Sequence, residues 1–239
     1  MRILKLAFNR EIAAPMFALS FASIVSVALV VARIFWTGKL HYAFLVWNLF
    51  LAWLPLVFAL LAREQYQNSS GRNGNFLGLT AAWLLFFPNA PYIFTDVTHL
   101  ATRYYSHFWV DLVLVLSCAL TGLILGFLSL FLMQSIVRRI WGGLASWGFI
   151  AGIAGLSGFG IYLGRFLRFN SWDVFFKPVT VYRGIGQWIA NPLGNSTSFA
   201  FPILFAAFLF IAYVMLYGLT HLQPATFAGQ ASRSEPQPV

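Results

Sequence analysis

Long apolar runs constrain this chain more than any other feature of its sequence. A helix rises about 1.5 Å per residue, so it needs about 20 apolar residues to cross a hydrocarbon core of about 30 Å. Composition agrees, because 9% of the residues are charged, whereas an ordinary soluble domain has about 25%. We therefore predict an all-α, polytopic integral membrane bundle. The runs of sufficient length are residues 12–36, 42–61, 109–133, 142–167 and 199–220.

One more apolar stretch, residues 75–87, supplies only about 20 Å of helix before Pro88, Asn89, Ala90 and Pro91 interrupt it. Backbone that leaves a helix at membrane depth loses hydrogen bonds that lipid cannot replace. Such a break is tolerated mainly where protein or a water-filled cavity surrounds it. We therefore predict about six spans, with the third broken at this point and the break bordering a cavity. We also expect Asn89 to cap a new helix that has Pro91 in its first turn.

The transmembrane domain is predicted to cover residues 12–222. The segment 1–11 before it is basic, and the apolar run that follows outlasts the core of a signal peptide, which has about 7 to 15 residues. We therefore expect an uncleaved first span. Residues 223–239 contain few apolar side chains and are predicted to be disordered. Polar loops are expected at residues 62–74 and 134–139.

The segment before the last span has a different composition. Residues 172–190 combine aromatic side chains with Lys177, Pro178 and Arg183, which makes them too polar and too interrupted to span a bilayer. Trp and Tyr favour the boundary between lipid and water. We predict that this segment lies on the membrane surface.

Basic residues are scattered between the apolar runs. A nucleic-acid-binding protein gathers them in a patch or stripe, so the net charge of +9 does not indicate a nucleic acid, and membrane lipids are the expected partners. With the N-terminus inside, eight Lys and Arg residues face the cytoplasm and seven face outward, or five if Arg165 and Arg168 belong to a site. Because short cytoplasmic loops carry the excess of basic residues, we expect a cytoplasmic N-terminus.

Polar residues converge on one predicted membrane face. Alternation of six spans brings together the loops after the first, third and fifth spans, and these loops contain three of the four histidines. Directly after the break, Tyr92, Asp96, His99 and Arg103 recur at spacings of four, three and four. These spacings place them on one face of a helix. The third span therefore leads into a polar stripe.

An aspartate at the centre of a spanning helix costs about 2.5 to 3.5 kcal/mol to insert, so Asp96 needs a partner. Arg165 or Arg168 at the end of the fifth span can supply it, and Asn48 in the second span points an amide to the same level. The group is either a plain ion pair that fixes helix packing or a polar pocket that binds a ligand. The candidate ligand-binding residues are Asn48, Asn89, Tyr92, Asp96, His99, Asp111, Arg165, Arg168, Asn170 and Asp173.

Three stretches resemble a known family. They are residues 47–55, which read WNLFLAWLP, residues 86–100, which begin FFPNAPY, and residues 160–173, which contain YLGRF and NSWD. Over roughly residues 42–217 the chain resembles the bacterial membrane proteins catalogued as domain of unknown function 1361. The resemblance implies a multi-pass protein of the bacterial inner (plasma) membrane, and it implies no activity or substrate.

Three functions fit these residues. The first is binding or transport of an anionic headgroup or a small polar ligand, because the arginines and the free N–H groups of a half-helix after the break attract anions. The second is a membrane-embedded, metal-dependent hydrolase or transferase. The third is a scaffold subunit without site chemistry. For the metal-dependent enzyme, the acceptable ligands for zinc or another divalent cation are Asp96, His99, His107, Asp111 and Asp173.

Other classes of site are excluded or disfavoured. Cys118 is the only cysteine, so neither an intramolecular disulfide nor a four-thiolate zinc site can form. A serine protease of the rhomboid type is disfavoured, because Ser157 and His221 are expected on opposite faces, more than about 20 Å apart. No nucleotide-binding loop, haem motif or EF-hand occurs. The sequence therefore assigns no cofactor, and it assigns neither a resident metal nor an oligomeric state.

Overall fold

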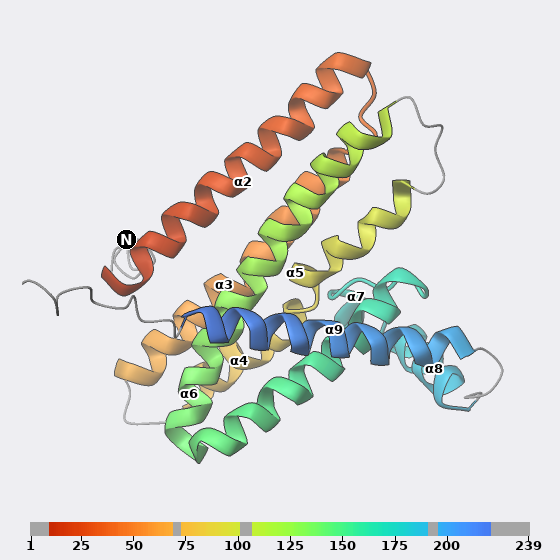
Figure 1. The fold of residues 1–239 in the computed structure, drawn as a ribbon. Coiled ribbons are helices and arrows are strands. Elements are labelled where there is room, and N and C mark those ends of the chain that lie inside the picture. The colour runs from red at the N-terminus through yellow and green to blue at the C-terminus, as the bar shows by residue number, and fades with distance from the viewer. Residues whose placement is uncertain (1–9, 69–72, 101–106, 191–195, 221–239) are drawn as a thin grey trace, which may run out of the picture.

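The computed structural model describes residues 10–68, 73–100, 107–190 and 196–220, and the regular structure within these ranges is helical (Figure 1). Five of its helical segments are long and apolar enough to cross a membrane, which confirms the predicted all-α, polytopic membrane bundle. In chain order the elements are α2 (Arg10–Thr37), α3 (Ala43–Asn68), α4 (Gly74–Phe86), α5 (Asn89–Tyr92), the 3₁₀ helix η1 (Ile93–Leu100), α6 (Phe108–Arg165), α7 (Asp173–Phe176), α8 (Pro178–Ala190) and α9 (Ser196–Thr220).

The two predicted terminal segments cannot be compared with these helices. The tail 223–239 lies outside the described residues, and so does most of the basic segment 1–11. The first predicted span corresponds to α2 and the last to α9. Both therefore lie where the apolar runs placed them.

The longest helix, α6, has 58 residues and folds back on itself (Figure 1). Its backbone leaves the helical region at Gly142, where φ is 87° and ψ is 178°. This combination is essentially restricted to glycine. The two arms, residues 108–141 and 143–165, each exceed the length of about 20 residues that a span requires. They correspond to the predicted fourth and fifth spans, and the total of six crossings stays a prediction.

Two predicted loops are wholly or partly helical instead. Residues 62–68 continue α3, and residues 134–139 belong to the first arm of α6. In that arm Gln134 is buried and accepts a hydrogen bond from the hydroxyl of Tyr213 in α9, at 2.6 Å. A polar side chain with a partner on a neighbouring helix is compatible with a continuous helix. The chain therefore reverses at Gly142 and not at residues 134–139.

The third span changes helix type at its predicted break. The α-helical pattern ends at Phe86 and is interrupted at Phe87 and Pro88. The chain then continues through α5 into η1. The amides of Ala90 and Tyr92 donate to the carbonyl oxygens of Phe87 and Pro88, at 3.1 and 3.0 Å. These two N–H groups are occupied and are not available to an anion, whereas anion binding by the half-helix as a whole stays a prediction.

Glycines allow the break to lie between the two arms of α6. A Cβ atom on Gly122 would lie 2.8 Å from the carbonyl oxygen of Ala90, and one on Gly160 would lie 3.0 Å from the ring of Pro88. Carbon atoms pack best at about 3.5 to 4.0 Å, so a larger residue at either position would displace the break. Gly148 differs, because a Cβ atom there meets nothing within 4 Å. The first arm holds one side of the break and the second arm holds the other.

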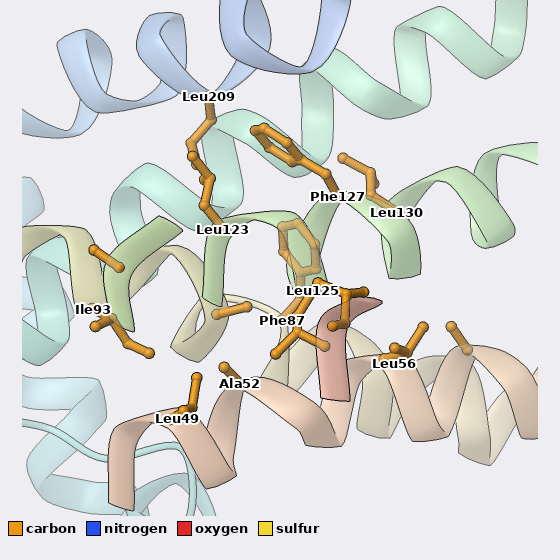
Figure 2. Packing of buried hydrophobic residues seen from close by; sticks show 14 of the residues in the cluster. Leu49, Ala52, Leu56, Phe87, Ile93, Leu123, Leu125, Phe127, Leu130 and Leu209 are labelled. Carbon is orange, nitrogen blue, oxygen red and sulfur yellow. The ribbon is translucent and has the colours of Figure 1, made fainter. Parts of the chain in front are cut away.

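A buried apolar cluster connects α3, the third span and the first arm of α6 (Figure 2). Leu49 and Leu56 of α3 belong to it, together with Phe87, Ile93 and Leu123. Because lipid is as apolar as these side chains, close packing holds membrane helices together more than the exclusion of water does. The cluster thereby fixes the positions of the two spans that carry Asn48 and Asp96.

Residues 172–190 form two short helices, α7 and α8, which is consistent with a segment that does not span. α8 has 13 residues, fewer than the roughly 20 that a span requires. Phe175, Phe176 and Tyr182 are exposed, whereas Val181 is buried. Exposed aromatic side chains on a short amphipathic helix are typical of the membrane interface. The location of this segment on the membrane surface stays a prediction.

Candidate functional site

A cavity of about 1070 Å³, called here the polar cavity, lies where α3 begins and the second arm of α6 ends. Its walls come from α3, α4, α5, η1, the second arm of α6 and the segment that contains α7 and α8. Pro88 contributes to the wall, so the break in the third span borders a cavity, as predicted. The polar residues that line it are Asn48, Asn89, Tyr92, Asp96, His99, Ser157, Arg165, Arg168, Asn170 and Ser171.

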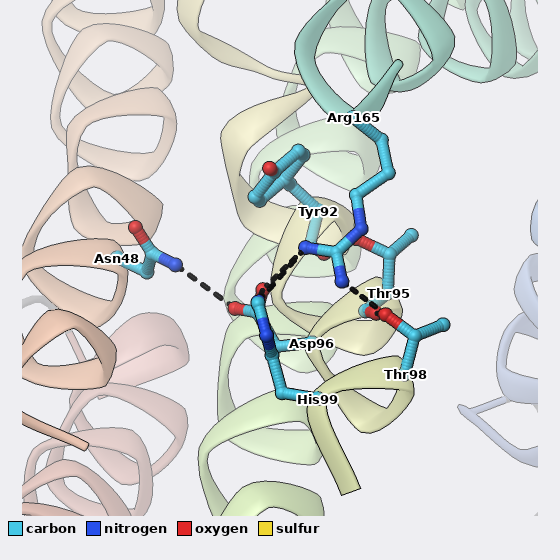
Figure 3. Close-up of polar contacts among 7 residues, drawn as sticks. All are labelled: Asn48, Tyr92, Thr95, Asp96, Thr98, His99 and Arg165. Carbon is cyan, nitrogen blue, oxygen red and sulfur yellow. Dashed lines mark hydrogen bonds and ion pairs between the residues drawn. The ribbon is translucent and has the colours of Figure 1, made fainter. Parts of the chain in front are cut away.

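Asp96 is the central residue of the polar contacts (Figure 3). Its side chain is only 2% exposed. Nη1 of Arg165 donates to its Oδ1 at 3.2 Å, and Nδ2 of Asn48 donates to its Oδ2 at 2.9 Å. A buried carboxylate requires an opposite charge and hydrogen bonds to be stable. Here α3 supplies one partner and α6 supplies the other, so three spans meet at one carboxylate.

Arg165 makes further contacts with η1 (Figure 3). Its Nη2 donates to Oγ1 of Thr98, and its Nη1 lies 3.2 Å from Nε2 of His99. The same His99 nitrogen lies 3.8 Å from Oδ1 of Asp96. A 3₁₀ helix has about 3 residues per turn, so residues three apart lie on the same side. The His99 side chain is 45% exposed, and Thr98 is exposed as well, so this side of the group is accessible.

Asn89 does not cap a helix, contrary to the prediction, because Pro88 occupies the cap position of α5. The Nδ2 atom of Asn89 donates to the carbonyl oxygen of Phe86 and to Oγ of Ser171, both at 2.9 Å. Ser171 in turn donates to the carbonyl oxygen of Leu85 at 3.1 Å. These bonds tie the segment after α6 to the end of α4, and they complete one wall of the polar cavity.

Arg168 follows the end of α6 in an unusual conformation. Its φ is 57°, and among the described residues it is the only one other than glycine with a positive φ. It is exposed, and no carboxylate in the described ranges forms an ion pair with it. Asp173, the nearby acid, is buried and accepts a bond from the backbone N of Asn170 at 2.7 Å. The cavity wall contains the positive charges of Arg165 and Arg168 and the negative charge of Asp96, so its net charge is +1.

Of the ten candidate residues, eight line the polar cavity and two do not. Asp173 stabilises the turn beside it. Asp111 begins the first arm of α6 and forms an ion pair with Arg33 of α2, at 2.6 Å between Oδ1 and Nε. That pair fastens α2 to the bundle, so Asp111 belongs to helix packing and not to the cavity wall. Arg103, which was predicted to continue the polar stripe, lies outside the described residues.

Thr98 and Ser171 are site residues that the sequence-based prediction does not contain. Thr98 accepts a bond from Arg165, and Ser171 joins Asn89 to α4. Each stands next to a predicted candidate in the chain, which is the one signal that pointed to them. Hydroxyl side chains are common in membrane helices and loops, so their presence alone does not distinguish a site from ordinary packing.

The predicted metal ligands do not come together. Among the residues that the structure describes, no three His, Cys, Asp or Glu side chains form a group that could hold a metal ion. Asp96 and His99 are neighbours, but Asp111 is paired with Arg33 and lies outside the cavity wall. The donor set of the hypothetical hydrolase or transferase is therefore not assembled in this part of the chain.

Ser157 lines the polar cavity without the surroundings of a nucleophile. Its hydroxyl donates to the carbonyl oxygen of Ile153, one turn earlier in α6, at 2.7 Å. Gly158 beside it packs so tightly that a Cβ atom would collide with the carbonyl oxygen of Pro202 in α9. His221 lies outside the described residues. The contacts of Ser157 are those of a small residue at a helix interface.

Comparison with known proteins adds a family and no activity. The family model described as "Protein of unknown function (DUF1361)" matches residues 47–214. The matched region contains all ten candidate residues, both arms of α6 and the break between α4 and η1. No curated protein and no solved structure matches the chain.

Proposed function

This chain belongs to the family described as Protein of unknown function (DUF1361), and we propose that it binds an anionic headgroup or a small anion in its polar cavity. The binding serves either recognition or transport of that ligand. The observation that carries the proposal is the position of Arg168, an exposed guanidinium on the cavity wall whose charge no described carboxylate neutralises. A guanidinium presents a rigid fork of donors that suits phosphate and carboxylate groups.

The buried pair beside it has a different role. Asp96 and Arg165 neutralise each other at 3.2 Å, and Asn48 occupies the second oxygen of Asp96. Because the donors of Arg165 are divided between Asp96 and Thr98, this arginine shapes the cavity wall more than it attracts a ligand. The net positive charge of the wall thus resides on Arg168, with His99 beside the pair as a further exposed polar group.

The rest of the wall supports a ligand with an apolar part. Trp47 and Leu84 line the cavity from α3 and α4, and Leu156 and Phe175 line it from α6 and α7. Ligand pockets commonly combine a mostly apolar lining with a few placed polar groups, in volumes of about 300 to 1,000 Å³. A cavity of about 1070 Å³ with one polar wall suits an amphiphile whose headgroup is anionic. A free anion shares the same headgroup chemistry, and the experiment below separates the two sources.

The cellular location is part of the same proposal. The chain is a multi-pass membrane protein, and we place it in the inner (plasma) membrane of a bacterium with its N-terminus in the cytoplasm. In that orientation the polar cavity opens on the outer side, because it lies at the end of α3 that is farther from the start of α2 (Figure 1).

Replacing Arg168 by asparagine tests the proposal. Asparagine tolerates the left-handed backbone better than most residues, so Arg168→Asn removes the charge without adding strain. The purified protein in a neutral detergent is titrated by calorimetry with inorganic phosphate and with short-chain phosphatidylglycerol. A charge-assisted hydrogen bond contributes about 1.5 to 3 kcal/mol, so the affinity for the bound probe should fall about tenfold or more. Binding of phosphatidylglycerol alone identifies a lipid headgroup, and binding of both probes identifies a site for anions in general.

Lys177→Asn is the matched control. Lys177 is an exposed cation just after α7 that does not line the polar cavity, so its removal changes the net charge equally and should leave the affinity unchanged. Wild-type protein that binds neither probe would refute the proposal. An Arg168→Asn protein whose titration shows no site that is lost or weakened relative to wild type would refute it as well.

A further inference from the structure

A second cavity, of about 630 Å³, lies at the opposite end of α3 from the polar cavity. Its walls come from α2, α3, the first arm of α6 and α9, near the start of α2 (Figure 1). Asn48 lines the polar cavity and Arg63 lines the second one. The fifteen positions between them in α3 correspond to about 22 Å along the helix axis. The two cavities are therefore separate, and each lies toward a different membrane face.

Most of the wall of the second cavity is apolar. Leu19 and Ala22 line it from α2, Ile124 and Leu128 line it from the first arm of α6, and Leu216 lines it from α9. No charged side chain of the described residues interrupts this part of the wall. A cavity between membrane helices with aliphatic sides accepts a hydrocarbon chain.

The charged side chains of the second cavity, and most of its other polar residues, lie where the helices end. Arg63 and Gln67 lie in the last turns of α3, Arg139 lies three residues before the bend of α6, and Thr220 ends α9. Arg138 is exposed next to Arg139 and donates to the hydroxyl of Tyr217, another wall residue, at 3.3 Å. Helix ends lie at the level of the lipid headgroups, so the basic side chains meet the part of a lipid that carries charge.

We propose that the second cavity binds an anionic phospholipid, with an acyl chain between α2 and α6 and its phosphate between Arg63 and Arg139. Charge complementarity identifies this occupant. By sequence, the charged residues at these helix ends and at the start of α2 are Arg10, Arg63, Arg138 and Arg139 against Glu11 and Glu64, which leaves a net charge of +2. A second copy of this chain would bring the same arginines to the contact, where like charges repel each other. A zwitterionic lipid has no net charge to complement them.

Two variants of the full-length protein test the site through different interactions. The protein is exchanged into equal amounts of phosphatidylglycerol and phosphatidylethanolamine and purified in mild detergent, and retained lipid is measured by mass spectrometry. Wild type should retain phosphatidylglycerol preferentially. Each basic residue near an anionic surface contributes about 1 kcal/mol, so Arg63→Gln with Arg139→Gln should lower this preference about fivefold for each arginine. Ala22→Phe fills the apolar part and should reduce retention of both lipids.

The controls use the same chemical changes outside the second cavity. Lys39→Gln with Lys177→Gln removes two exposed cations near the other membrane face, and Ala28→Phe enlarges an exposed residue of α2 that lines neither cavity. Both should retain lipid as wild type does. Arg168→Asn should also leave this lipid bound, so failure of the proposed function and failure of this inference are distinguishable.

Three results would overturn the inference. One is equal retention of the two phospholipids by wild type. Another is unchanged retention in both the arginine and the Ala22→Phe variants. The third is a wild-type dimer, measured by light scattering, that Ala22→Phe converts to a monomer, because a second copy of the chain would then occupy the second cavity.

Discussion

A buried carboxylate is stable in a membrane protein only while the groups that neutralise it are held in place. At Asp96 these groups come from distant parts of the chain, because Asn48 lies 48 positions before it and Arg165 lies 69 positions after it. The two bonds therefore depend on the packing of α3, η1 and α6 together. Replacing any of the three residues should therefore weaken the packing of these three elements.

Replacement of Arg165 by glutamine should leave Asp96 buried without its counter-charge. Breaking a buried pair in this way costs about 3 to 5 kcal/mol, so the free energy of unfolding should fall by roughly that amount. The double variant Asp96→Asn with Arg165→Gln leaves no unpaired charge, and it should be less destabilised than Arg165→Gln alone. Equilibrium unfolding in detergent measures both, with Asp96→Asn completing the double-mutant cycle.

Arg183→Gln provides the comparison for this cycle. Arg183 is exposed on α8 and lines neither cavity, so its replacement should change the unfolding free energy by no more than about 0.5 kcal/mol. If the losses from Asp96→Asn and Arg165→Gln simply add in the double variant, the two side chains are not coupled. That result would contradict the role given to the pair.

The sequence predicted the contacts of Asp96 because ionisable groups in a membrane require partners and few partners were available. It left open which arginine pairs with Asp96, since Arg165 and Arg168 are three positions apart and would share one face of a continuous helix. The helix ends at Arg165, and the positive φ of Arg168 turns the chain away. Asp111 was misplaced because alternation of spans predicts the membrane face of a residue but not its lateral neighbours.

At the scale of elements, the bend of α6 depends on one glycine. Gly142 has φ 87° and ψ 178°, whereas the adjacent Gly143 does not have a positive φ, and a Cβ atom on either meets nothing within 4 Å. Any effect of adding a Cβ atom at these two positions is therefore due to the backbone and not to a steric collision. Comparing alanine variants at the two positions therefore measures the effect of backbone strain without a contribution from side-chain packing.

Gly142→Ala should lower the free energy of unfolding by roughly 1 to 3 kcal/mol, the usual cost of a side chain in a strained backbone region. Gly143→Ala should leave it unchanged or raise it slightly, because alanine favours a helix. Thermal unfolding of the two purified variants beside wild type gives the comparison. Equal stability of the two variants would mean that the bend does not require glycine at residue 142.

The elements that the sequence misplaced share a physical cause. Polar residues at 62–68 and 134–139 were interpreted as loops, because a loop on water is the commonest place for them. In α3 they mark the end of the apolar part of the helix and not the end of the helix itself. In α6, Gln134 is satisfied by Tyr213 across a helix contact. The contact of Gln134 cannot be predicted without knowing the neighbouring helix.

At the scale of the whole molecule, the apolar runs predicted the class of fold, while the arrangement of its parts depends on contacts between distant spans. Residues 12–36 and 199–220 required no tertiary information, because length and apolarity alone identify a span. The approach of both arms of α6 to the break did require it, since equally spaced glycines elsewhere in α6, such as Gly148, meet nothing. Small residues predict a close approach only once the partner is known.

The ion pairs also change which charges determine orientation. Among the described residues, Arg33 and Arg165 form ion pairs with Asp111 and Asp96, and both belong to the seven basic residues assigned to the outer face. Setting these two aside leaves five basic residues on that face, the number that the sequence count reached by excluding Arg165 and Arg168. The excess still favours a cytoplasmic N-terminus. Orientation is thus a property of the whole distribution of charge, and it can be tested at the two ends of one helix.

Lys39 and Asn68 are both exposed, and they lie close to the two ends of α3, which is about 39 Å long. If the N-terminus is cytoplasmic, Lys39→Cys should react with a membrane-impermeant maleimide on intact bacterial cells, and Asn68→Cys should react only after the cells are broken. The native Cys118 is buried and should not contribute. The reverse pattern would place the N-terminus outside. Labelling of both positions on intact cells would mean that α3 does not cross the membrane, which contradicts the bundle itself.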